Sequence, residues 1–285
     1  MLIKKDYKEL IEFKAAQTLF GWPIYTTHFY YFDGILIDTG PTHTADEVLK
    51  AVQSLPINKV IITHRHEDHT GNCALIKDYF NVPVYAHQET IKILENPPDI
   101  EIYRKIMWGN MLPTSALPVE DIIKSNKYKL QAIHTAGHSR DHMCYFEPEN
   151  RFLFAGDFYL GENLNGFMVG ENIVEHLEGL KRLISLNPQT LFCGLKGRLD
   201  NATERLKRKH DAWWKLCCMV RDMYNSGVSR KNILREAFGG EILFFYFSQS
   251  NWGRRYMLDT IIDNLSYFQE DNNNKESLLK SGRDS

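Results

Sequence analysis

The chain has 285 residues, 43% of them hydrophobic and 12% aromatic, so it carries enough apolar material for a large buried core and, by length, about two domains. Its formal net charge is -2, which argues against nucleic acid or a membrane surface as an obligatory partner. The five cysteines form no CxxC pair, and no apolar run approaches the ~18 residues of a membrane span. We therefore expect a cytoplasmic protein with free thiols.

The first part of the chain alternates predicted strands and helices. Alternating residue character predicts a strand at Lys8 to Ala16. A hairpin of two strands follows from Pro23 to Asp38 and turns at Asp33-Gly34. Thr44 and Glu47 form a capping-box pattern that predicts a helix over Ala45 to Ser54. Further strands are expected at residues 58–63 and 82–86, and further helices at residues 71–80 and 88–95.

The middle of the chain continues this alternation after one irregular stretch. Residues Asp99 to Pro118 have weak periodicity, and we expect a long ordered loop or a short helix over a site. A helix fits Val174 to Ser185. Strands are predicted at residues 128–134, 143–147, 152–155 and 190–193. The alternation indicates an α/β core with both sheet faces covered by helices.

After Asn201 the pattern becomes helical throughout. Helices are predicted at residues 202–225, 229–238 and 252–268, with Ser229 as an N-cap. We expect a core domain over residues 1–200, a helical C-terminal subdomain over 201–268 packed on that core, and a disordered polar tail over 269–285. The basic run Arg205 to Lys209 is interpreted as a solvated helix face.

Four candidate metal ligands follow directly after the strand that ends at Thr63. They are His64, His66, Asp68 and His69. Two histidines spaced two residues apart can aim both imidazoles at one point, while Asp68 and His69 can face a second point nearby. Imidazole nitrogen and carboxylate oxygen are ligands that zinc and iron accept. The segment therefore predicts a metal site at a sheet edge.

Two further ligand types stand on glycine-containing loops at strand ends. His138 lies in Thr135-Ala136-Gly137-His138-Ser139, and Asp157 follows Leu153-Phe154-Ala155-Gly156. The carboxyl ends of strands are where α/β folds place their sites. Each residue alone is typical of a surface position, but with the first cluster they form a constellation.

In that order, His64-x-His66-x-Asp68-His69, Gly137-His138 and Gly156-Asp157 resemble the metallo-β-lactamase superfamily, from about Lys8 to Leu199. The amino-acid sequence around His138 and Asp157 is most similar to glyoxalase II-like and lactamase-like hydrolases. The resemblance implies a four-layer αβ/βα sandwich. It also implies His64, His66 and His138 at one metal, Asp68 and His69 at a second, and Asp157 bridging the two.

The resemblance implies a hydrolase that uses zinc, with iron or manganese as alternatives because the same ligands suit all three. A divalent metal lowers the pKa of bound water from about 15.7 to near 7, so hydroxide is available at neutral pH. The hydroxide attacks a small ester, thioester or lactone, and Asp68 takes or delivers the proton. The substrate itself stays undetermined.

The sequence departs from the family pattern at one ligand. Family members usually carry a further histidine near the end of the core, just before a glycine, whereas this chain has Leu195 or Lys196 there; we favour Leu195. Three interpretations remain open. The second site is completed by water or substrate, the protein works with one metal, or the Lys196 ammonium pairs with Asp68 or Asp157 and replaces the missing cation.

The other histidines and the aromatic residues are interpreted mainly as structural. His142 is assigned equally to a contact behind the ligands or to packing, and His28, His43, His87, His134, His176 and His210 to packing or surface positions. The aromatic residues cluster in the linker and C-terminal region, where they fit helix packing, a substrate-pocket wall or lid, or a homodimer interface. This group comprises Tyr103, Trp108, Trp213, Trp214, Phe244, Phe245, Tyr246, Phe247 and Trp252.

Three competing functions stay open beside the hydrolase. A phosphodiesterase or ribonuclease is disfavoured because the chain has no excess of basic over acidic residues. A mononuclear iron oxidoreductase of the persulfide dioxygenase kind agrees with the incomplete second site. A non-catalytic binding protein is disfavoured by the complete triad of His64, His66 and His138.

Overall fold

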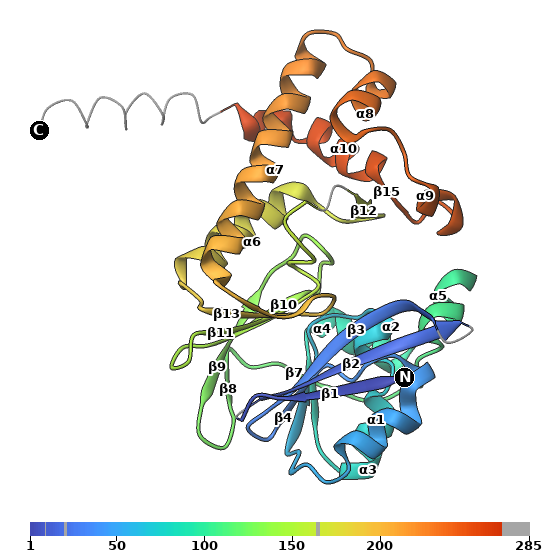
Figure 1. The fold of residues 1–285 in the computed structure, drawn as a ribbon, viewed down its shortest axis with the longest axis vertical. Helices are drawn as coiled ribbons and strands as arrows, with labels where there is room; N and C mark the ends of the chain where they lie inside the picture. The colour runs from blue at the N-terminus through green and yellow to red at the C-terminus, as the bar shows by residue number, and fades with distance from the viewer. Residues whose placement is uncertain (9, 20–21, 164–165, 270–285) are drawn as a thin grey trace, which may run out of the picture.

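The computed structural model describes residues 1–8, 10–19, 22–163 and 166–269. Except for Gln269, the predicted tail over 269–285 lies outside these residues. Two sheets dominate the fold (Figure 1). The seven-stranded sheet runs in chain order, antiparallel from β1 to β4 and parallel from β4 to β7. Its strands are β1 (Leu2–Asp6), β2 (Leu10–Leu19), β3 (Trp22–Phe32), β4 (Ile35–Ile37), β5 (Lys59–Ile61), β6 (Val84–Ala86) and β7 (Leu117–Pro118).

The six-stranded sheet has the order β14-β13-β11-β10-β9-β8 and is antiparallel except between β13 and β11. Its strands are β8 (Ile122–Lys124), β9 (Lys129–His134), β10 (Met143–Glu147), β11 (Phe152–Gly156), β13 (Thr190–Cys193) and β14 (Gly197–Asp200). A separate pair, β12 (Phe167–Met168) and β15 (Trp252–Gly253), ties the chain before α6 to the C-terminal region.

Helices cover the outer face of each sheet, because each face carries apolar residues that must be buried. The first sheet packs on α1 (Ala45–Val52), α3 (Cys73–Phe80) and α4 (Gln88–Glu95) through one apolar cluster. A second cluster, with Phe32, Tyr145 and Phe154 at its centre, lies between the two sheets. The second sheet packs on α6 (Ile173–Ser185) and α7 (Ala202–Asn225). The layers are therefore the four of the predicted αβ/βα sandwich.

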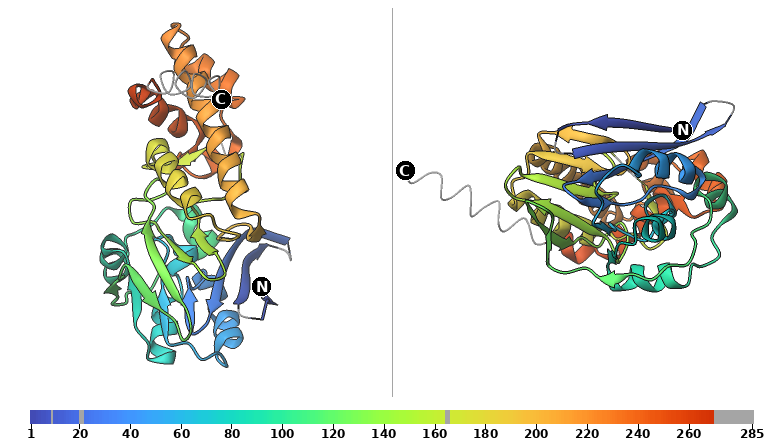
Figure 2. Two further views of the ribbon diagram at one scale, coloured as in Figure 1. Left: turned by 90° about the vertical axis from the view of Figure 1, so that its left-hand side faces the viewer. Right: turned by 90° about the horizontal axis from the view of Figure 1, so that it is seen from below.

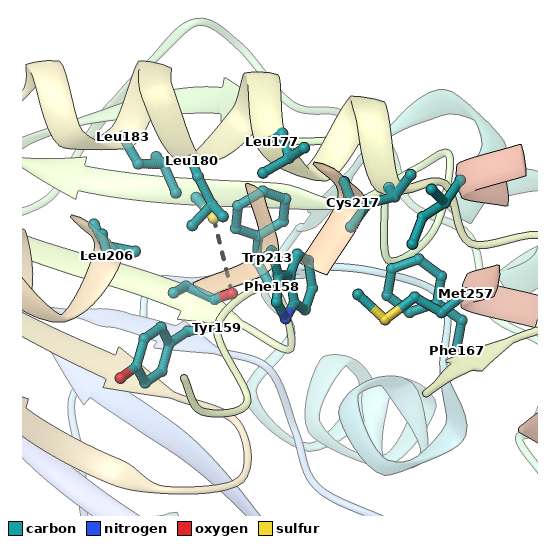
Figure 3. Close-up of a cluster of buried hydrophobic side chains, with 14 of the residues drawn as sticks. Phe158, Tyr159, Phe167, Leu177, Leu180, Leu183, Leu206, Trp213, Cys217 and Met257 are labelled. Atoms are coloured by element: carbon teal, nitrogen blue, oxygen red, sulfur yellow. Dashed lines mark hydrogen bonds between the residues drawn. The ribbon is translucent and has the colours of Figure 1, made fainter. Parts of the chain in front are cut away.

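The C-terminal helices extend the cluster on the outer face of the second sheet. These helices are α7, α8 (Arg230–Phe238), α9 (Leu243–Phe247) and α10 (Arg254–Asp263), followed by the short 3-10 turn Leu265–Phe268. Leu180 of α6, Trp213 of α7 and Met257 of α10 lie in this one cluster with Phe158 from the core (Figure 3). Figures 1 and 2 show α7 running from the end of β14 away from the first sheet. The helices predicted at residues 202–225 and 229–238 are present as α7 and α8, and the division at residue 200 stays a prediction.

Several local expectations need correction. The sequence pattern predicts no strand before Lys8, yet β1 pairs with β2 along its whole length. Thr44 begins α1 without a side-chain cap, because its hydroxyl donates to the carbonyl of Pro41 at 3.0 Å. The predicted helix over 252–268 is broken into β15, α10 and a 3-10 turn. The run Arg205 to Lys209 is not a solvated face throughout, because Leu206 and Lys209 are buried.

Within the described residues, no helix is both long enough and apolar enough to serve as a membrane span.

Candidate metal centre

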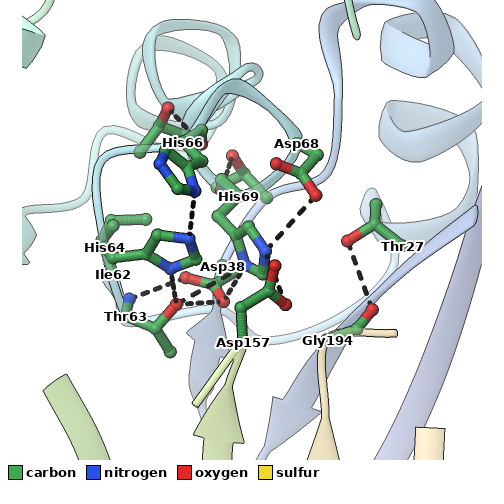
Figure 4. A network of polar contacts seen from close by, with 12 residues as sticks. Thr27, Asp38, Ile62, Thr63, His64, His66, Asp68, His69, Asp157 and Gly194 are labelled. Carbon is green, nitrogen blue, oxygen red and sulfur yellow. Dashed lines mark hydrogen bonds and ion pairs between the residues drawn. The ribbon is translucent and has the colours of Figure 1, made fainter. Parts of the chain in front are cut away.

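The candidate ligands gather where strands of both sheets end, and Figure 4 shows His64, His66, Asp68, His69 and Asp157 close together. Strand β5 leads into Thr63 and the segment from His64 to His69, and β11 leads into Asp157. His138 lies on the loop between β9 and β10. The short helix α2 (Glu67–Thr70) turns the first segment so that Asp68 and His69 face inward, and both are buried. Strand ends from two sheets thus meet at one edge, as the sequence predicts.

Three imidazole nitrogens converge at the first position. His66 Nδ1 lies 2.9 Å from His64 Nε2 and 3.2 Å from His138 Nε2. With Zn–N bonds of about 2.0–2.1 Å, two nitrogens of a tetrahedral site lie about 3.3 Å apart. Only small outward shifts would be needed to admit an ion, so the triad of His64, His66 and His138 has the spacing of a metal site.

A second group of donor atoms adjoins the first. His64, His69 and Asp157 form this group, with His69 Nε2 at 3.3 Å from Asp157 Oδ1. Asp68 Oδ2 lies beside it, 3.4 Å from the same nitrogen. His69 Nε2 is buried and has no hydrogen-bond partner among the described residues. An imidazole nitrogen that lies between two carboxylates without a hydrogen bond fits a bound cation, because a buried polar atom without a hydrogen bond is costly.

Burial and neighbouring charges prepare the histidines differently. Burial and the nearby histidines hold the pKa of His64 and of His66 well below the usual value, so both imidazoles are neutral, as metal ligands must be. Burial would also lower the pKa of His69, but the carboxylates of Asp68, Asp157 and Asp38 outweigh it and raise that pKa well above the usual value. The second position therefore favours a positive charge.

Residues outside the predicted set hold the ligands in place. Asp38, at the end of β4, accepts from the backbone N–H of Thr63 at 2.8 Å, and its Oδ2 lies 2.7 Å from His69 Nδ1. His138 Nδ1 lies 3.4 Å from Glu171 Oε1, and burial would lower the pKa of His138, but Glu171 raises it. Contacts of this kind with the other ring nitrogen fix the orientation and the tautomer of an imidazole that binds a metal. The strand-end rule that found Asp157 could have found Asp38, whereas Glu171 carried no sequence signal.

Asp141 joins the two ligand loops. Its buried carboxylate accepts from the backbone N–H of Arg65 at 2.8 Å and from the Thr90 hydroxyl at 2.6 Å. His142, next in sequence, is fully buried and packs with its ring 5.0 Å from that of His64. His142 therefore lies behind the ligands, which was one of its two predicted roles.

The segment that replaces the usual last histidine offers no ligand side chain. A Cβ on Gly194 would lie 2.2 Å from Asp157 Oδ1, so the site leaves no room for a side chain there. Leu195 packs against the apolar cluster of the second sheet, and Lys196 is exposed. Among the described residues, the ion pairs of Asp68 and Asp157 are with His69 and His138 and not with Lys196, so the interpretation with a substituting ammonium stays a prediction.

The site is covered on one side by α5 (Ile102–Trp108), which confirms the alternative of a short helix within Asp99 to Pro118. Arg104 of α5 donates from Nη2 to Glu67 Oε2 at 2.7 Å, and Glu67 lies between the ligands His66 and Asp68. The ring of Tyr103 on α5 also packs edge-on against the rings of Phe244 and Phe247, with 6.3 Å between ring centroids in each pair. Some of the C-terminal aromatic residues therefore reach the cover of the site.

A cavity of about 440 Å³ opens beside the imidazole triad. It is lined by His66 and His138 from the triad and, among others, by Arg104 and Asn251 from the covering segments. Its volume is in the range of small-molecule sites.

The chain thus combines an α/β sandwich with two adjoining groups of metal-binding donor atoms at one edge. A family model described as the metallo-beta-lactamase superfamily matches residues 33–194, and the chain belongs to this superfamily. Two solved structures share the fold. A family member from Thermus thermophilus has a TM-score of 0.66 at 18% identity and covers 93% of this chain and 94% of its own. The metallo-beta-lactamase from Pontibacter korlensis has a TM-score of 0.60 at 17% identity, covering 75% and 99%.

Among the curated relatives, an uncharacterized protein of Aquifex aeolicus is 28% identical over 175 residues, which are 57% of this chain and 78% of that protein. A hydroxyacylglutathione hydrolase of Bdellovibrio bacteriovorus is 24% identical and covers 67% of each chain. A thioesterase of Emericella nidulans is 28% identical, over 61% of this chain and 46% of that protein. The names of these last two relatives are those of hydrolases, and they support a hydrolase in general terms.

Proposed function

We propose that this protein is a metal-dependent hydrolase that cleaves a small ester, thioester or lactone. The observation that carries the proposal is the convergence of three imidazole nitrogens beside a cavity, with two carboxylates and a fourth histidine next to them. Relatives named thioesterase and hydroxyacylglutathione hydrolase favour the thioester among the three bonds.

We assign the residues as the family resemblance implies. His64, His66 and His138 hold one metal, His69 and Asp68 hold a second, and Asp157 lies between them. Zinc is the metal we expect, since these nitrogen and oxygen donors suit it. A divalent ion bound here supplies acidified water and polarises a carbonyl oxygen.

The chain's own residues then do four things. The neutral imidazoles of His64 and His66 offer lone pairs. Asp38 and Glu171 orient His69 and His138. The carboxylate of Asp68 accepts and returns a proton during hydrolysis. Helix α5 limits the access of bulk water, which strengthens every charge interaction at the site.

The test is hydrolysis by the zinc-loaded full chain of a panel with one thioester, one lactone and one aryl ester. We expect zinc-dependent turnover of at least one member. His138→Gln should lower kcat/KM by more than the ~10–100-fold typical of outer contacts, while His210→Gln on α7 should leave it unchanged. Absence of turnover of the whole panel, with zinc bound, would refute the proposal.

A further inference from the structure

The phenol of Tyr25 reaches the second group of donor atoms. Tyr25 lies on β3, is half-buried, and donates from its hydroxyl to Asp68 Oδ2 at 2.7 Å. Trp108 of α5 packs edge-on against its ring at 5.2 Å, which holds the ring in place. The family resemblance assigns Asp68 to the site, but it assigns no role there to Tyr25.

Strand β3 also borders the segment that lacks the usual histidine. The backbone N–H of His28 donates to Gly194 O at 2.6 Å, and the hydroxyl of Thr27 donates to the same oxygen at 3.4 Å (Figure 4). Tyr30 donates from its hydroxyl to Cys193 O at 2.7 Å. Tyr25 therefore approaches the second group of donor atoms from the strand that borders residues 194–196, where the usual histidine is missing. Residues 194–196 themselves offer no side chain that could serve as a ligand instead.

Consecutive donor atoms around the second position are spaced like neighbouring ligands of one small cation. From Tyr25 Oη to Asp68 Oδ2 is 2.7 Å, and from there to His69 Nε2 is 3.4 Å. From His69 Nε2 to Asp157 Oδ1 is 3.3 Å. With metal–ligand bonds of about 2.0–2.2 Å, neighbouring ligands in tetrahedral to octahedral sites lie roughly 2.8–3.6 Å apart. The four atoms form a chain with nearly this spacing throughout.

We propose that the phenol oxygen of Tyr25 is a ligand of the second metal and takes the place of the missing histidine. When the cation binds, the metal–oxygen bond forms, the phenol O–H bond breaks, and the proton leaves to solvent. The second position then has three oxygen ligands and one imidazole, against three imidazoles at the first. Oxygen ligands suit harder cations, so the second position prefers manganese or ferric iron relative to the first. The inference rests on the proposed function only in requiring that a second metal binds.

Metal stoichiometry and a spectroscopic signature test the ligand directly, without an activity assay. The metal-free full chain is titrated with Mn²⁺ and, separately, with Fe³⁺, for the wild type, Tyr25→Phe and Tyr30→Phe. Tyr30→Phe is the matched control, because it removes a buried hydroxyl from the same strand that contacts no carboxylate of the site. We expect two bound equivalents in the wild type and in Tyr30→Phe, and one in Tyr25→Phe. Ferric loading should give a visible phenolate-to-iron absorption that only Tyr25→Phe loses.

Retention of the first equivalent by Tyr25→Phe shows that the variant folds and keeps the imidazole triad. Two equivalents in Tyr25→Phe, or no phenolate absorption in the ferric wild type, would overturn the proposal. A wild type that binds one metal and still hydrolyses a thioester overturns the Tyr25 ligand and leaves the proposed function standing. A wild type that binds two metals and shows the phenolate absorption but hydrolyses nothing overturns the proposed function and leaves the Tyr25 ligand standing.

Discussion

The buried ammonium of Lys209 on α7 makes the stability of this protein depend on pH. Lys209 is 1% exposed, and its Nζ donates to the carbonyls of Phe158, at 3.0 Å, and Tyr159. It lies 4.3 Å from the ring centroid of Trp213. Burial lowers the pKa of Lys209 from 10.5 to about 7, against the opposing charges of Cys193, Glu171 and Asp157.

The sign of the effect follows from proton binding. Between the folded pKa of about 7 and the unfolded value of 10.5, the unfolded chain holds the proton more often than the folded chain does. The free energy of unfolding contributed by Lys209 therefore rises with pH in this window, by at most about 1.4 kcal/mol per unit. Because the folded group is half protonated near pH 7, the rise between about pH 7 and pH 9 is roughly 2 kcal/mol.

The assay is urea unfolding of the wild type and Lys209→Met at both pH values, with equal zinc content. Methionine is an unbranched side chain one atom shorter than lysine, and it removes the amine that titrates. Wild-type stability minus variant stability should rise by roughly 2 kcal/mol on going from about pH 7 to pH 9. Lys207→Met, on the exposed face of the same helix, should show a constant difference from the wild type. A constant difference for Lys209→Met as well would refute the reasoning.

Two further predictions concern residues that hold the ligands. Asp38→Asn removes the charge against His69 Nδ1, so the affinity of the second metal should fall by ~10–100-fold in a metal titration while the first is kept; equal affinities would contradict this role. Asp141→Ala leaves the backbone N–H of Arg65 without its buried acceptor, so the free energy of unfolding should fall by about 1–3 kcal/mol in urea; a change below the lower value would show that the two loops are joined by other contacts.

Local pattern was sufficient for most elements of the fold. Helix α4 has the predicted bounds, as has α7, because apolar periodicity and capping act within a few residues. The ligand segment was recognised for the same reason, since His64, His66, Asp68 and His69 are close in sequence. The structure brings them together with His138 and Asp157, and their role as ligands stays a prediction.

Contacts between segments that are distant in the chain could not be predicted from local sequence patterns. Tyr25 meets Asp68 across 43 positions, and Glu171 meets His138 only because β12 and the turn after it fold back on the loop. Lys209 was expected in solvent because its neighbours Lys207 and Arg208 are charged, yet the helix turns it toward the carbonyls after Asp157. Such positions depend on which strands and helices become neighbours in space, and local sequence patterns do not reveal those neighbours.

The central claim is that His64, His66 and His138 bind a metal ion. It is tested most directly by metal analysis of the full chain purified without added metal, beside His66→Ala and the exposed control His43→Ala. The account predicts at least one equivalent of zinc, iron or manganese in the wild type and in His43→Ala, and a clear loss in His66→Ala. Less than a tenth of an equivalent of any metal in the wild type, also after incubation with zinc, would contradict it.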